Sequence, residues 1–180
     1  MLELLVVLGL ITVLIGLALA GASTLRKRSQ SVSCISNLRQ IGGAFTQYAL
    51  MNNRFFPPPN SLKTSPSWEL TLSGSFIDNP DVFHCPADEV VYPYVGSSYD
   101  WRDTGDPSTT LAGTAITDTT RGGFVLASEA TANFHAKGKI NVVFIDGSAG
   151  EMDSVACFKD TMLPIRNASV LGSGPILSGN

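Results

Sequence analysis

Four side chains in the C-terminal half, Glu129, His135, Asp146 and Asp153, could in principle hold a metal ion or form an acid/base pair. Their spacing matches no recognised catalytic or zinc-binding pattern. We therefore favour a structural role, in which Asp146 accepts turn N–H groups and Gly147 supplies a positive φ. In this interpretation His135 hydrogen-bonds across the same hairpin.

A second candidate is the carboxylate of Glu3, which opens an apolar run from Leu4 to Leu25 that contains no charged residue. As a helix, the run of 22 residues would be about 33 Å long, enough to cross the hydrocarbon core of a membrane. A carboxylate in such surroundings costs roughly 2 to 3 kcal/mol or more, so it needs a partner. We expect that partner to be the N-terminal amine of a neighbouring subunit.

Three cysteines, Cys34, Cys85 and Cys157, allow one disulfide and one remaining thiol. Cys34 falls in an expected helix, whereas Cys85 and Cys157 both fall in the expected globular domain. We favour the pairing of Cys85 with Cys157 over that of Cys34 with Cys85.

The element that would carry Glu3 is a single helix from about residue 2 to about residue 52, roughly 75 Å long. After the basic cluster Arg26 to Arg28, apolar residues recur at three- and four-residue spacings, which predicts a buried face. That face comprises Val32, Ile35, Leu38, Ile41, Phe45, Tyr48 and Ala49. The prolines from Pro57 to Pro59 end the helix. A small domain cannot bury so long a helix, so its first half must find partners elsewhere.

Short strands are expected in the remainder of the chain. The clearest is Ile140 to Ile145, followed by an Asp146-Gly147 turn and a return strand from Ala149 to Met152. Tyr92 to Val95 and Gly123 to Ala127 are further strand candidates, and Trp68 to Leu72 is either helical or extended. The stretch from Asp100 to Thr120, rich in Asp, Thr, Gly and Pro, predicts an exposed loop.

The bulk composition points away from nucleic acid as a main partner. The formal net charge is -3 and the sequence pI is about 5.2, so the chain has no basic excess. Without a recognised catalytic constellation, we also expect that the protein is not an enzyme and carries no cofactor.

The segment Met1 to Val7 resembles the mature start of type IV pilins and of type II secretion pseudopilins. The segments Ser33 to Gly42 and Phe83 to Asp88, together with His135 and Asp146-Gly147, resemble pilin-like proteins of planctomycetes and verrucomicrobia that carry an "H-X9-DG" domain. Two features depart from that pattern. The glutamate is third rather than fifth, and ten residues rather than nine separate the histidine from the aspartate.

This resemblance implies an α+β pilin-like fold, in which a long helix packs on a small antiparallel sheet. It divides the chain into a filament-core or transmembrane segment 1–25, a packing helix 26–56 and a globular domain 57–180. It also implies local unwinding of the helix near Gly16 to Gly21, although close helix packing at these glycines is an open alternative. Because related major pseudopilins hold calcium in a C-terminal loop, Asp146, Glu151 and Asp153, with Ser148, are weak calcium candidates that do not follow the EF-hand pattern.

The expected function is therefore that of a structural subunit, which polymerises through its N-terminal helix into an extracellular pilus-like filament. The resemblance implies a prepilin peptidase that cuts and methylates the N-terminus, assembly machinery as a partner, and an inner-membrane stage before assembly. One alternative is the major pseudopilin of a type II secretion system, which forms a periplasmic pseudopilus. Two others are a membrane-tethered binding module and a secreted hydrolase behind a cleaved leader. The start Met1-Leu2-Glu3 lacks the basic residues of such a leader.

Overall fold

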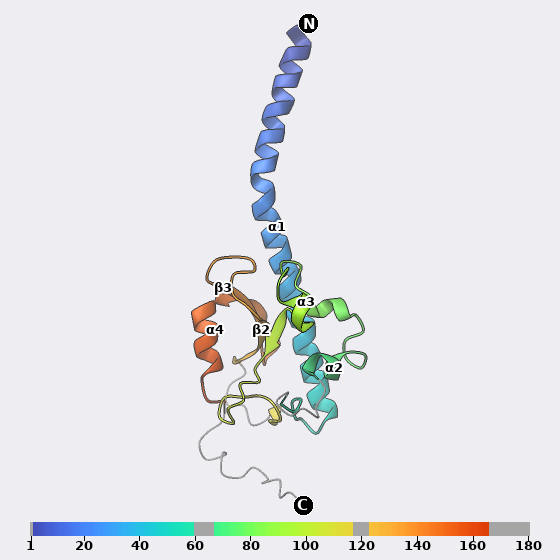
Figure 1. Cartoon of the computed structure of the whole chain (residues 1–180), viewed down its shortest axis with the longest axis vertical. Coiled ribbons are helices and arrows are strands. Elements are labelled where there is room, and N and C mark those ends of the chain that lie inside the picture. Colours follow the sequence, from blue (N-terminus) through green and yellow to red (C-terminus); the bar gives the residue numbers. More distant parts are fainter. Residues whose placement is uncertain (1, 60–66, 117–122, 166–180) are drawn as a thin grey trace, which may run out of the picture.

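The computed structural model describes residues 2–59, 67–116 and 123–165, and for residues 2, 5 and 17–23 it describes only the helical backbone. The chain combines a 50-residue helix with a four-stranded antiparallel sheet in the order β1-β2-β3-β4 (Figure 1). This confirms the α+β class. The helices are α1 (Leu2–Met51), α2 (Trp68–Leu72), the 3-10 helix η1 (Pro80–Phe83), α3 (Tyr92–Val95) and α4 (Ser154–Thr161); the strands are β1 (Tyr99–Trp101), β2 (Val125–Glu129), β3 (Lys139–Phe144) and β4 (Ala149–Asp153).

Helix α1 ends where the sequence predicts. Asn53 and Arg54 take positive φ angles of 53° and 68°, and the amide of Arg54 donates to the carbonyl of Ala49. The chain then turns away from the helix axis, and Pro57 makes a return to helix unfavourable.

The second half of α1 packs into the domain through one stripe, formed by Cys34, Leu38, Ile41, Phe45 and Ala49. Their spacings of four, three, four and four residues place them on one helix face. The predicted face is therefore largely confirmed, but its start was wrong. Val32 is 68% exposed, and Cys34 is the first buried residue of the stripe.

Aromatic rings fill the core around Phe45. Its ring stacks on Trp101 of β1 and Trp68 of α2, with centroids 4.8 and 5.7 Å away, and meets Phe56 edge-on at 6.4 Å. Phe45 thus joins α1 to the first strand of the sheet and to the segment that follows the helix.

Strand β3 separates two packing layers. Asn141 and Val143 face α1, because Asn141 contacts Ser31 and the Cγ2 atom of Val143 lies 2.7 Å from where a Cβ on Gly42 would sit. Ile140 and Val142 alternate with them and pack with Cys157 of α4 in a second apolar cluster. The sheet is therefore covered by α1 on one face and by α4 on the other.

The predicted β3–β4 hairpin is confirmed, with Lys139 opposite Asp153 and Val143 opposite Ala149. The predicted strand at 123–127 is confirmed as β2, shifted by two residues. The strand predicted at Tyr92 to Val95 is wrong, because this segment forms α3, with Pro93 in its first turn and Gly96 at φ 85° as its C-cap.

The exposed loop predicted over Asp100 to Thr120 is wrong in part: residues 105–107 and 113 are exposed as predicted, but others are not. Residues 109–112 and 114 are buried, and Trp101 belongs to β1. The polar composition predicted exposure, but these short polar side chains form hydrogen bonds within the loop. The Thr110 hydroxyl, for example, donates to the carboxylate of Asp103 at 3.2 Å.

Candidate functional site

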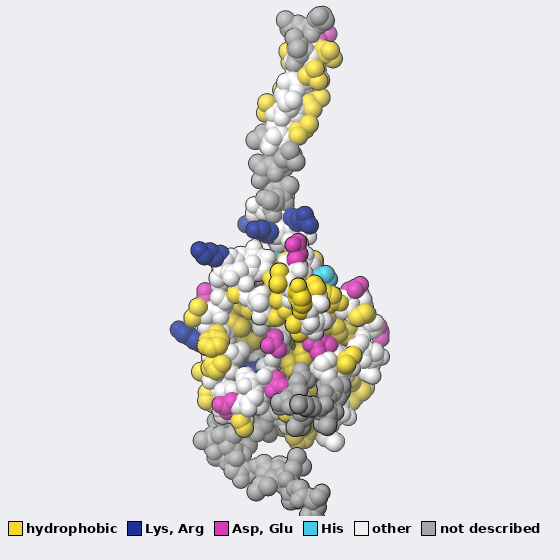
Figure 2. All heavy atoms as spheres, in the orientation of Figure 1, with side chains coloured by type: hydrophobic (Ala, Val, Ile, Leu, Met, Phe, Trp, Pro, Cys, Tyr) yellow, Lys and Arg dark blue, Asp and Glu magenta, His cyan; other side chains and the backbone are white. Residues whose placement is uncertain are grey.

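The N-terminal part of α1 extends from the globular domain as an arm, which we define as residues 2–29 (Figure 1). Ten large apolar side chains on it are between 46% and 66% exposed, which is close to what an isolated helix would show. They are Leu4, Val6, Val7, Leu8, Leu10, Ile11, Val13, Leu14, Ile15 and Leu25. Figure 2 shows apolar side chains along the distal half of the arm and basic side chains at its junction with the domain.

The arm ends in the domain at Gln30, whose side-chain amide donates to the carbonyl of Pro86 at 2.8 Å. Arg26, Lys27 and Arg28 remain exposed just before this point. The helix segment that packs on the domain therefore starts near residue 30, rather than at the predicted residue 26.

The backbone of α1 is helical without a break from Leu2 to Met51, so the unwinding expected near Gly16 to Gly21 is not observed in the single chain. A transmembrane segment is expected from the sequence over residues 1–25. In the described part of the chain, which leaves out residue 1 and the side chains of residues 2, 5 and 17–23, no helix is long and apolar enough to cross a membrane. Glu3 lies exposed near the tip of the arm.

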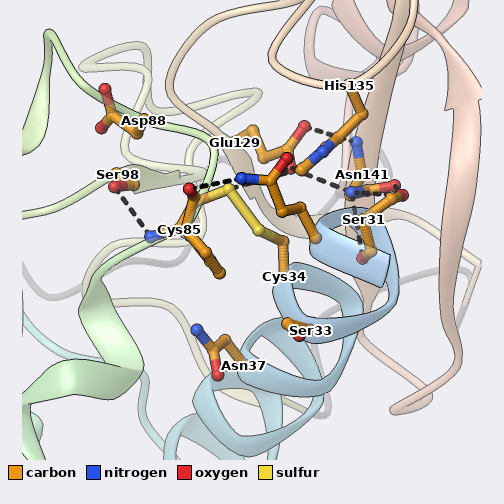
Figure 3. The surroundings of a disulfide bond; sticks show 12 residues. Ser31, Ser33, Cys34, Asn37, Cys85, Asp88, Ser98, Glu129, His135 and Asn141 are labelled. Atoms are coloured by element: carbon orange, nitrogen blue, oxygen red, sulfur yellow. Dashed lines mark hydrogen bonds and ion pairs between the residues drawn. A yellow bond between two sulfur atoms is a disulfide. The ribbon is translucent and has the colours of Figure 1, made fainter. Parts of the chain in front are cut away.

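A disulfide joins Cys34 of α1 to Cys85, two residues after η1 (Figure 3). The favoured pairing of Cys85 with Cys157 is therefore wrong. Cys157 is a buried free thiol on α4, on the opposite face of the sheet. Burial raises the pKa of the Cys157 thiol, which keeps it in its unreactive protonated form.

Glu129 and His135 meet beside this disulfide. The Nε2 atom of His135 lies 3.0 Å from Oε1 of Glu129 and 3.4 Å from Sγ of Cys85. All four side chains are secluded from solvent: both cysteines are fully buried, and the side chains of His135 and Glu129 are 6% and 1% exposed. We call Cys34, Cys85, Glu129 and His135 the disulfide cluster.

The carboxylate of Glu129 is held by Asn141 on the neighbouring strand. The side-chain amide of Asn141 donates to Oε1 at 2.9 Å, and its backbone N–H donates to Oε2 at 3.0 Å. The same amide also donates to the hydroxyl of Ser31 on α1, as Figure 3 shows. Helix, strand and loop thus fix the position of the carboxylate together.

The turn between β3 and β4 has the structure predicted for Asp146 and Gly147. The hydrogen bond predicted for His135, which lies before β3, is not formed. Oδ1 of Asp146 accepts from the hydroxyl of Ser148 at 2.6 Å and from its amide at 2.9 Å, which lowers the pKa of Asp146. Gly147 has a φ of 83°. The expected hydrogen bond of His135 across the hairpin is wrong, because its imidazole points to Glu129 and Cys85 instead.

The weak calcium candidates do not gather. Asp146 lies at one end of the β3–β4 hairpin and Asp153 at the other, where it caps α4 by accepting from the amides of Val155 and Ala156. Among the described residues, the His, Cys, Asp and Glu side chains that lie close enough together to share an ion are those of the disulfide cluster.

The sequence therefore pointed to His135, Glu129 and Cys85 separately, but not to their meeting. The signal that was missed is the position of Glu129 at the end of β2, six residues before His135, with Asn141 on the next strand. The joint site of Glu129, His135, Asp146 and Asp153, which we set aside in favour of a structural role, does not form, because the hairpin separates the two aspartates.

Comparisons with models of known protein families, with curated proteins and with solved structures found no match.

Proposed function

We propose that this chain is a structural subunit with a pilin-like fold, which polymerises by packing its arm against the arms of other copies. The observation that carries the proposal is the row of ten apolar side chains along the arm, each about half exposed or more in the single chain. Contiguous exposed apolar surface of this kind marks a site of interaction with another protein or with lipid.

The free energy at stake is large enough to hold an assembly together. Burial of a side chain such as Leu, Ile or Val contributes about 1.5 to 3 kcal/mol when it is complete. Ten half-exposed side chains thus offer on the order of 10 kcal/mol per subunit. This gain must offset the entropy that each subunit loses on joining the polymer.

The shape of the arm favours copies of the same chain as partners. At 28 residues and a rise of about 1.5 Å, it extends about 42 Å from the domain, in line with the packed half of the same helix. Apolar side chains lie all around the helix rather than along one stripe, so several neighbours are needed to cover it. A bundle of staggered arms inside a shell of globular domains meets this need.

Glu3 and the basic residues after the arm give such a bundle a defined stagger. In a bundle core, the carboxylate of Glu3 must be neutralised, and the N-terminal amine of a neighbouring subunit can do this. The exposed Arg26, Lys27 and Arg28 mark where the apolar core ends.

The same contact would serve an extracellular pilus-like filament, which we favour, or a short periplasmic pseudopilus. Filament length on cells distinguishes these two. A tethered binding module would use the arm without any contact between arms, so the assembly state of the purified chain separates it from both.

The test is removal of residues 1–25 from the purified chain, compared with the full chain after detergent dilution. Electron microscopy and light scattering should show polymers of the full chain and a soluble monomer of the shortened one, with the circular dichroism of a folded domain. Polymers of the shortened chain would refute the role of the arm.

Replacing Glu3 with Ala then tests the proposed stagger. We expect impaired assembly, while the domain unfolds at the same urea concentration as the unaltered chain, because Glu3 lies exposed near the tip of the arm and its proposed partner belongs to another subunit. Normal filaments from Glu3→Ala would refute the proposed pairing, but not polymerisation through the arm.

A further inference from the structure

We propose that the disulfide cluster, with its two cysteines reduced, is a binding site for a thiophilic divalent cation such as Zn²⁺, and that disulfide formation expels the ion. The proposal does not depend on filament assembly. Thiolate, imidazole and carboxylate are each zinc ligands in proteins, and two thiolates, one imidazole and one carboxylate supply the four that a tetrahedral site needs.

The distances between the ligand atoms fit a tetrahedral site. All four atoms lie within 4.8 Å of one another. Sγ of Cys85 lies 3.4 Å from Nε2 of His135 and 3.9 Å from Oε1 of Glu129, and these two atoms are 3.0 Å apart. Tetrahedral zinc with ordinary bond lengths places such atom pairs about 3.4 to 3.6 Å apart. Shifts of about half an ångström would be sufficient for these three ligands.

The main change on reduction is the separation of the two sulfur atoms, which tetrahedral zinc holds about 3.8 Å apart. The Cα atoms of Cys34 and Cys85 are 5.3 Å apart, so rotation of the side chains can supply this separation without moving α1. The protein then fills all four positions, which is typical of a structural rather than a catalytic zinc site.

The surroundings of Glu129 already resemble the outer shell of a metal site. Asn141 holds the carboxylate of Glu129 with two hydrogen bonds, and Ser31 holds the amide of Asn141. Such second-shell bonds orient ligands before the ion arrives. A disulfide alone requires neither an imidazole nor a carboxylate within 4 Å of its sulfur, and a metal site explains both.

A catalytic thiol–disulfide exchange centre is a poorer explanation of the same residues. Such a centre needs a sulfur atom that the thiolate of a partner protein can reach, whereas both cysteines are fully buried. A small ion requires far less access than a second protein.

The chemistry balances in two steps. A phosphine and one water molecule reduce the disulfide, which gains two electrons and two protons while the phosphine becomes its oxide. Binding of Zn²⁺ then releases the two thiol protons. In the reverse direction, a small disulfide oxidant takes two electrons from the two thiolates and, with two protons, becomes two thiols, and the ion leaves.

The experiment is an anaerobic titration of the full chain in detergent solution with Co²⁺, after reduction by a phosphine and removal of the excess. We expect thiolate-to-cobalt charge-transfer bands and tetrahedral ligand-field bands that saturate at one ion per chain, are displaced by Zn²⁺, and disappear when a disulfide oxidant is added. The oxidised chain should show none of them.

Variants identify the ligands. Cys157→Ser is the matched control and should bind as the unaltered chain does, because Cys157 lies beyond the sheet. Cys34→Ser should lose the charge-transfer bands, and Glu129→Gln and His135→Gln should each weaken binding at least tenfold. Circular dichroism of each reduced chain reports whether the domain is folded.

Three results would overturn the proposal. They are a folded reduced chain that binds no cobalt, a reduced chain that unfolds without binding it, and binding that survives Cys34→Ser or oxidation.

Discussion

At the scale of single residues, Asp88 shows how one buried carboxylate organises a loop. It is 3% exposed, and its two oxygens accept from the amides of Val90, Val91 and Tyr92 at 2.7 to 2.9 Å. Burial alone would raise the pKa of Asp88, but the hydrogen bonds from Ser98 and from these amides outweigh it, so the pKa is lowered.

The change Asp88→Asn should therefore cost about 1 to 3 kcal/mol of unfolding free energy at neutral pH, because the amide cannot accept all these bonds. Since the folded pKa lies below the unfolded value of about 3.9, the carboxylate stabilises the fold above that pH. This contribution is lost as the pH falls through the folded pKa.

Urea unfolding of both chains at pH 7 and at pH 3 measures this effect, and the difference between them should shrink at the lower pH. Asp146→Asn, in an exposed turn, is the control and should have a smaller effect. If Asp88→Asn lowered the unfolding free energy by the same amount at both pH values, the stabilising role of the ionised Asp88 carboxylate would be contradicted.

The disulfide supports a second residue-scale prediction. Its cysteines are 51 residues apart. If a disulfide stabilises by lowering the entropy of the unfolded chain, its loss should lower the free energy of unfolding by up to about 4 kcal/mol. We expect Cys34→Ser to lower the urea midpoint strongly, while Cys157→Ser keeps the disulfide and changes stability much less. Peptide mapping of the unreduced chain checks the pairing directly, and a Cys85–Cys157 peptide would contradict it.

At the scale of elements, the closest approach of α1 to the sheet depends on a glycine. A Cβ on Gly42 would lie 2.7 Å from Cγ2 of Val143, a buried and β-branched side chain that cannot rotate away cheaply. Gly42→Ala should therefore push α1 away from β3 and lower the free energy of unfolding by about 1 to 3 kcal/mol.

The adjacent Gly43 is the matched control, because a Cβ there would meet nothing within 4 Å. Gly43→Ala should stabilise α1 by about 0.5 to 1 kcal/mol, since alanine has the higher helix propensity. Thermal unfolding of the two variants should move in opposite directions. Equal shifts would mean that α1 does not pack as closely as described.

The elements also show what the sequence could and could not predict. Helix α1 and the β3–β4 hairpin were predictable, because an apolar period and an Asp-Gly turn are local signals. Helix α3 was not, because four residues with a proline fit a helix or a strand equally well. Arg102 links the buried segment 109–112 to α4: its Nε donates to the carbonyl of Thr109 at 2.8 Å and its guanidinium pairs with Asp160 at 3.1 Å. Contacts between residues so far apart in the sequence leave no local pattern.

The disulfide cluster was unpredictable for the same reason. Its ligand atoms come from α1, from the segment after η1, from β2 and from the loop that follows β2, which only the folded chain brings together. The pairing of Cys34 was missed because Cys34 falls on the long helix, whereas Cys85 and Cys157 were both expected in the globular domain.

At the scale of the whole molecule, a compact domain and an apolar arm share one helix. The domain buries its own core around Phe45. The described side chains of the arm are exposed, and a 28-residue helix with ten exposed apolar side chains is not a stable end state in water. This division makes polymerisation the central claim.

The most direct test is electron microscopy of material sheared from producing cells, with mass spectrometry of the subunit's N-terminus. We predict long filaments whose subunits retain the apolar segment through Leu25. Finding only monomers trimmed near Ser23 would contradict the claim and identify a secreted soluble protein.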